Sequence, residues 1–408
     1  MDIGLVMNTM RDPAGIPSHP LVFQLLMVVT WVFHIAFVHL TLGSAAMALY
    51  AFWKRHQNHH WEQLTIAMTK VAKVSVSMAV VLGVAPLLFT QVIYDPQWYF
   101  SNVISATWVI GFILTLIIGY TLWFVFYFKN HAGASNSIAI FGLVGLGLML
   151  FDGFIMHALS YQALLPEQWM SWYSPSSGQI DNSGNGIHAY QWQRFGFVIV
   201  LSLVMLGAYL MAYADYFNPR SDKSGDYLAW ARGMGTRIAF AGLVISLPLL
   251  ALWYIDLPVY VADHTGLAFL AVVAISIMAM IFFWFERHNR FEHGYRALVM
   301  YGALAIAVAV LREVIRMAYL NPLGYDIMTY KVVEDWSSTG LFFSTFIVVG
   351  GLVGGFYLSM LYKAGRVVGE YQADKTVARL GTGAVAILVV WIAVFFAVGI
   401  WTWLGNIV

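Results

Sequence analysis

The feature that most constrains this chain is a series of ten apolar stretches, each long enough to cross a bilayer as a helix of about 20 residues. The stretches cover residues 22–53, 74–94, 103–128, 136–165, 192–216, 234–256, 265–286, 295–320, 338–362 and 381–404. Only 10% of the 408 residues are charged, whereas soluble domains carry roughly 25%. The sequence therefore predicts an all-α fold, with residues 1–408 forming a single integral membrane domain. That domain is a polytopic transmembrane helical bundle of about ten helices.

Positive charge alternates between the two sides of the predicted membrane. Sixteen of the 21 lysines and arginines lie in the loops that follow the odd-numbered stretches. The opposite loops hold only Arg11, Arg194 and Lys331. Because basic residues prefer cytoplasmic loops, we expect both the N- and the C-terminus to lie outside. The longest outer loop, 166–190, has no basic residue and is a candidate docking surface or lid.

The composition excludes several classes of site. The chain has no cysteine, which rules out disulfides, thiolate metal sites, iron–sulfur clusters and covalently attached haem. Its net charge is +1 and no basic stripe exists, so nucleic acid is not an expected partner. Any redox cofactor must therefore be held by histidine, methionine or carboxylate side chains.

The eighth stretch, ALAIAVAVLREVIRMAYL, contains Arg312, Glu313 and Arg316. A charge at the bilayer centre costs about 2.5–3.5 kcal/mol on insertion scales, so buried charges mark functional or structural sites. Two arginines face one carboxylate, which leaves a positive charge for an anionic group. Haem propionates or a carboxylate of a neighbouring helix would satisfy it. The alternative interpretation is an internal ion pair that only holds helices together.

Three histidines lie well inside the predicted spans, namely His34 and His39 on the first and His157 on the fourth. At 1.5 Å per residue, His34, His157 and Glu313 fall at a similar depth near the outer surface. A buried imidazole can join helices by a hydrogen bond, relay protons or ligate haem. Their shared depth favours haem b. Because His34 and His39 are about 140° apart around one helix, they should face different neighbours.

These observations define the candidate site. The predicted cofactor-binding residues are His34, His39, His157, Arg312, Glu313 and Arg316. The predicted metal ligands, for a haem iron, are His34, His39, His157 and Glu313.

Two motifs resemble subunit I of cytochrome bd quinol oxidase. The segment FHIAFVHLTLG is similar to the first helix of that family, in which the histidine matched by His34 is a haem ligand. The segment EVIRMAY stands where the family has EVGRQPW. The resemblance implies that Glu313 takes the position of a ligand of the high-spin haem b, and that Arg316 takes the position of an arginine beside the haems.

Weaker matches accompany these two, and the departures are informative. QVIYDPQW resembles the family's QFGTNW-type segment, and Arg194-Phe195 matches an RF pair. The third stretch carries no carboxylate, whereas the family has glutamates there. Phe197 replaces the histidine of the low-spin haem, and 256–264 is a short turn instead of a long quinol-binding loop. His39 and His157 are candidate replacement ligands.

The sequence thus favours a membrane haem b electron-transfer subunit, an oxidoreductase component linking the quinone pool to a periplasmic or membrane-attached redox partner. The expected cofactors are one or more haem b groups, with quinone or quinol as a second candidate. The expected partners are other membrane redox subunits, a cytochrome c or multihaem cytochrome on the outer side, and the lipid of a bacterial or archaeal cytoplasmic (inner) membrane. Three alternatives stay open: a cytochrome bd-like terminal oxidase, a haem-free quinol-binding anchor and a secondary transporter.

Overall fold

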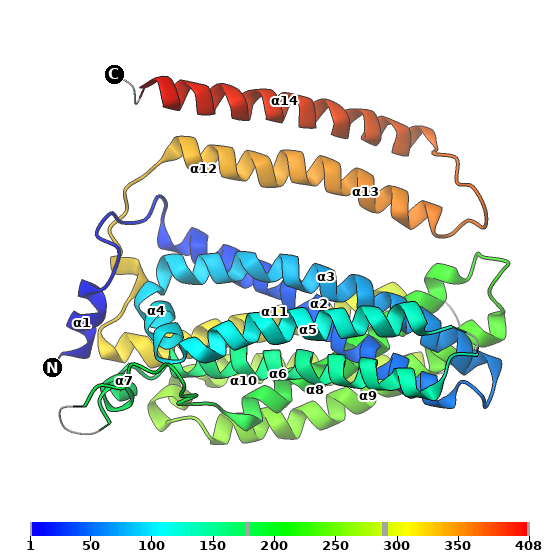
Figure 1. The fold of residues 1–408 in the computed structure, drawn as a ribbon, viewed down its shortest axis with the longest axis horizontal. Helices are drawn as coiled ribbons and strands as arrows, with labels where there is room; N and C mark the ends of the chain where they lie inside the picture. The colour runs from blue at the N-terminus through cyan, green and yellow to red at the C-terminus, as the bar shows by residue number, and fades with distance from the viewer. Residues whose placement is uncertain (1, 132, 176–178, 288–292, 406–408) are drawn as a thin grey trace.

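The computed structural model of the chain is an elongated bundle of roughly parallel and antiparallel helices (Figure 1), which confirms the all-α polytopic fold. The structure describes residues 2–131, 133–175, 179–287 and 293–405. Ten helical segments in these ranges are long and apolar enough to cross a membrane, one for each predicted stretch. The helices are α1 Ile3–Thr9, α2 Pro20–Lys54, α3 His59–Ile93, α4 Asp95–Ile104, α5 Ala106–Lys129, α6 Ala139–Gln162, α7 Pro166–Tyr173, α8 Trp192–Phe217, α9 Gly225–Ile255, α10 Val259–Glu286, α11 Gly294–Leu320, α12 Trp336–Phe343, α13 Gly350–Ala364 and α14 Lys375–Gly405.

Two helices begin well before their apolar stretches, because polar side chains cap them. The side chain of Asn58 accepts a hydrogen bond from the backbone of Trp61 at the start of α3, and Ser224 does the same for Tyr227 at the start of α9. Such caps satisfy backbone N–H groups that have no partner within the helix. Basic residues expected in loops therefore lie on these helices instead. They are Lys70, Lys73, Arg232 and Arg237.

At the end of the bundle that the charge pattern predicts to be outer, the connections contain short helices that hydropathy does not reveal. The predicted loop 166–190 begins with α7, and α4 lies between α3 and α5. Apolar side chains of α1 and α7 join Tyr94 and residues at the adjoining ends of α2 and α3 in a core cluster that includes Met7 and Trp169. This end is called the outer end, and the opposite one the inner end.

The transmembrane helices pack mainly as sequential pairs, with α2 along α3, α5 along α6 and α8 along α9. Small residues allow the closest approach between α8 and α9. A Cβ atom on Gly207 would lie 2.3 Å from the carbonyl oxygen of Gly235. Close backbone contact of this kind is how membrane helices gain packing energy without a hydrophobic driving force.

The predicted ninth span is divided into α12, a π-helical segment η4 Ser344–Val349 and α13, which is followed by α14. Together these form a C-terminal hairpin at the edge of the bundle (Figure 1). None of the residues of α12, η4 and α13 is buried, and α14 buries only Val377 and Ala384. The N-terminal region and the end of α14 lie at the same end of the molecule (Figure 1).

Candidate functional site

His34 on α2 has the hydrogen-bond pattern of a metal-ligating histidine. Its Nδ1 donates to the carbonyl oxygen of Ala79 on α3, at 2.9 Å. Since a carbonyl only accepts, the neutral ring carries its proton on Nδ1 and keeps a free lone pair on Nε2. Histidines that bind metals are held by such a bond to the other nitrogen. Gly83 makes room for the ring, because a Cβ atom there would lie 2.9 Å from His34 Cε1.

His39, five residues further along α2, faces a different helix, as its spacing from His34 predicts. Its Nδ1 is hydrogen-bonded to the hydroxyl of Tyr301 on α11, at 2.7 Å. The ring is 2% exposed, its Nε2 forms no hydrogen bond of normal geometry with the described residues, and a backbone group of Val198 on α8 lies close to the ring. The hydroxyl of Tyr301 can donate or accept, so Nε2 has a free lone pair only when Nδ1 is the donor to Tyr301.

His157 on α6 is engaged in a different way. Its Nε2 accepts a hydrogen bond from the backbone N–H of Gln191, at 3.0 Å, and Gln191 immediately precedes α8. The ring lies parallel to that of Tyr161 and against Phe195. His157 therefore fixes the start of α8, and it could ligate a metal through Nε2 only by releasing Gln191.

Glu313 on α11 has both carboxylate oxygens occupied. Oε1 accepts from Gln24 at 2.9 Å and from the hydroxyl of Tyr94 at 2.5 Å. Oε2 accepts from Arg316 at 2.7 Å, and the Arg316 guanidinium also lies over the Tyr94 ring. Charge-assisted hydrogen bonds of this kind are among the strongest in proteins. In this arrangement Glu313 is the charge partner of Arg316, and coordination of iron would require it to give up Tyr94 or Gln24.

Two further arginines leave the cluster with an excess of positive charge. Arg312 on α11 lies over the ring of Trp31, 4.0 Å from its centroid, and forms no ion pair with any described carboxylate. Arg194 on α8 is 8% exposed, and its Nη1 has no partner in the described part of the chain. Arg194, Arg312 and Arg316 repel one another electrostatically. Glu313 neutralises one of them, so about two positive charges remain uncompensated.

The histidines and arginines predicted from the sequence are brought together. Arg312 acts electrostatically on both His34 and His157. His34 and Arg312 keep accessible surface although they lie deep among protein atoms, so both can reach a bound group. In the sequence Arg194 stands out only as part of a motif. The contacts of Gln24 and Tyr94 with Glu313 could not be predicted, because pairing between helices leaves no periodic pattern in the sequence.

The donor set limits what this region can bind. Among the described residues, no three histidine or carboxylate side chains converge as a metal-ion site. Haem needs only one or two axial ligands. His34 fits that requirement with a free Nε2, and His39 fits it when its Nδ1 donates to Tyr301, while His157 and Glu313 are committed to other partners.

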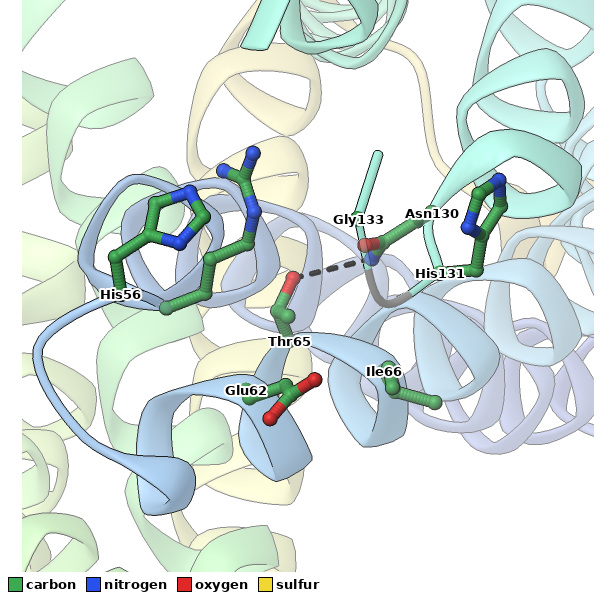
Figure 2. A pocket seen from close by; sticks show the side chains of 8 residues that line it. His56, Glu62, Thr65, Ile66, Asn130, His131 and Gly133 are labelled. Atoms are coloured by element: carbon green, nitrogen blue, oxygen red, sulfur yellow. Dashed lines mark hydrogen bonds between the residues drawn. The ribbon is translucent and has the colours of Figure 1, made fainter. Parts of the chain in front are cut away.

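A small pocket of about 110 Å³ lies at the opposite, inner end (Figure 2). Arg55, His56 and His131 line it together with Glu62 and Asn130. Asn130 donates to the hydroxyls of Thr65 and Thr69, which ties the loop after α5 to α3. The pocket therefore belongs to a loop junction, far along the helices from the buried histidines.

No protein-family model matches the sequence, and no curated protein matches it. The fold, however, is similar to that of a chain in the structure of bd oxidase from Geobacillus thermodenitrificans. The similarity has a TM-score of 0.60 at 13% sequence identity and covers 84% of this chain and 98% of the other. The resemblance to cytochrome bd oxidase is thereby confirmed at the level of the fold. In architecture the chain is a bd-like, multi-pass membrane protein.

Proposed function

We propose that the chain is a membrane subunit that binds non-covalent haem b near its outer end and transfers electrons between quinone and an external redox partner. The observation that carries the proposal is the uncompensated charge of Arg194 and Arg312 beside the free Nε2 of His34. A buried positive excess favours an anionic group. Haem combines an iron atom, which needs the imidazole, with propionates, which need the arginines.

Haem b, when bound, supplies a one-electron carrier. His34, whose Nδ1 is held by α3, and His39, whose Nδ1 is held by α11, would each bind a haem iron through Nε2, and because they face different neighbours they would not share one haem. Arg312 and Arg194 would hold propionates. His157 positions α8 and Arg194 in this scheme.

We propose a quinone site around Glu313 at the outer end. Oε1 of Glu313 meets the hydroxyl of Tyr94 and the amide of Gln24, two groups that can also bind quinone oxygens. The same features support the haem-free quinol-binding anchor as a second candidate.

The excess of acidic residues on the outer face favours a positively charged redox partner. Exposed acidic residues of the outer connections are Asp2, Asp12, Glu167, Asp181, Asp256, Asp263, Asp326 and Glu334. The basic residues described there are Arg11 and Lys331. Such a field attracts a positively charged protein and raises its association rate. We therefore propose a basic cytochrome as the external partner, with an electron-transfer rate that falls as salt rises.

An absorption spectrum of the purified, dithionite-reduced protein tests the haem directly. We expect a haem b spectrum, with all the haem extracted by acid-acetone because no cysteine is present to bind it covalently. His34→Ala should remove haem, whereas His59→Ala should not, because His59 is 71% exposed at the inner end of α3. Intact protein without a Soret band would reject haem and favour the quinol-binding anchor.

A further inference from the structure

A carboxyl group that the haem proposal does not use lies between α5 and α6. Asp152 on α6 is 4% exposed, and its Oδ1 lies 2.5 Å from the hydroxyl oxygen of Thr115 on α5. At 1.5 Å per residue it is about 20 Å from the inner end of α6 and about 15 Å from the outer end. It is therefore an acidic group near the middle of the membrane, where such residues usually have a function.

The hydrogen bonds around Thr115 show which form of Asp152 is held. The Thr115 hydroxyl has one proton, and it lies 2.8 Å from the carbonyl oxygen of Gly111 as well as 2.5 Å from Asp152. Gly111 can only accept. If the hydroxyl donates to Gly111, Asp152 must itself donate to the hydroxyl oxygen, and it must then be protonated.

The surroundings favour this neutral form. No charged group of the described residues acts electrostatically on Asp152. Helix α5 carries no ionisable side chain near this level, and its Tyr120 is bonded to Ser77. On α6 itself, His157 is the nearest titratable residue and is bonded to Gln191. A buried carboxylate without a cation is costly, so the group holds a proton instead.

The same pair can also accommodate the charged form. If Asp152 loses its proton, the Thr115 hydroxyl can turn from Gly111 and donate to Oδ1, since both acceptors lie within hydrogen-bond distance. The other oxygen, Oδ2, is buried and has no partner among the described residues. A carboxyl that only joined two helices through Thr115 would not need this second, unpartnered oxygen.

We propose that Asp152 is a proton-binding site of the membrane domain, which binds a proton and exchanges it through Oδ2 while Thr115 stabilises the ionised form. In each cycle one O–H bond of the carboxyl breaks, and the proton passes to a water or other mobile base at Oδ2. The carboxylate then receives the Thr115 hydrogen bond. The inference goes beyond electron transfer and does not depend on haem, because the residues that form the site are all on α5 and α6.

Infrared difference spectroscopy of the whole protein, between mildly acidic and alkaline pH, tests the proposal. We expect a protonated-carboxyl C=O band at mildly acidic pH that shifts in deuterated water and disappears at alkaline pH. Asp152→Asn keeps the shape and a hydrogen bond to Thr115 but should lose the band completely. A spectrum without an Asp152-dependent band, or with one that persists at every pH at which the protein stays folded, would overturn the proposal.

Thr115→Val provides a matched second variant, because it keeps the volume and removes the hydroxyl. The band should remain and should disappear only at higher pH, since the ionised form has lost its hydrogen-bond donor. An unchanged or lower transition pH would contradict the assigned role of Thr115. Both measurements can be made on haem-free and haem-loaded protein, so failure of this site is distinguishable from failure of the haem proposal.

Discussion

The two ends of the bundle carry buried charge clusters that differ in how far their charges are compensated. At the inner end, Arg232 on α9 pairs with Glu286 on α10 at 2.7 Å and with Asp215 on α8 at 3.3 Å. Glu286 also meets His293, and Asp215 accepts from the backbone of Gly294 at the start of α11. At the outer end, three arginines repel one another, and among the described residues only Arg316 pairs with a carboxylate, that of Glu313.

The difference separates a structural cluster from a binding site. The inner cluster satisfies its charges with its own residues and joins four consecutive helices, so it needs no ligand. The outer cluster leaves Arg194 with an unpartnered Nη1 and Arg312 with only an aromatic ring. Retaining unneutralised charge in an apolar bundle is reasonable only if something anionic completes it.

The largest effect is expected at the inner cluster. Arg232→Leu removes the guanidinium that pairs with the two buried carboxylates of Asp215 and Glu286. Breaking a buried ion pair by removing one partner costs about 3–5 kcal/mol. We expect a large fall in the thermal stability of the detergent-solubilised protein. Arg237→Leu, an exposed arginine on the same helix, is the control and should change little.

At the outer cluster, Glu313→Gln should destabilise the haem-free protein by about 1–3 kcal/mol, because Arg316 then loses its charge partner. The double variant Glu313→Gln/Arg316→Gln should be less destabilised than either single variant, since it leaves no unpaired charge at this position. Denaturation of the three proteins measures this. If the loss of stability in the double variant equals the sum of the losses in the two single variants, Glu313 and Arg316 do not interact.

The smallest effect on stability is expected for Arg312→Leu. The variant loses a cation–π contact with Trp31, worth about 1 kcal/mol, but it also relieves repulsion from Arg194 and Arg316. Stability of the haem-free protein should therefore stay within about 1 kcal/mol of the original, while haem content per polypeptide falls. A large loss of stability with unchanged haem content would make the outer cluster structural, like the inner one.

Much of this architecture could be predicted from the sequence, because hydropathy reports directly on helices that face lipid. The ten spans and the burial of His39 and Glu313 follow from length and polarity alone. The sequence did not predict which residues of different helices contact one another. Arg232 was expected in a loop, and the partners of Asp152 and His157 come from other helices at positions that no periodicity encodes.

The C-terminal hairpin touches the rest of the chain mainly near its two ends. Phe342 meets Phe89 of α3 at one end, while the hydroxyl of Tyr216 and the guanidinium of Arg220 bond to backbone carbonyls of α13 and its C-cap at the other. These 70 or so residues leave the ribosome after the eight helices that contain the histidines and arginines. The bundle can therefore complete its core during biosynthesis before the hairpin docks against it.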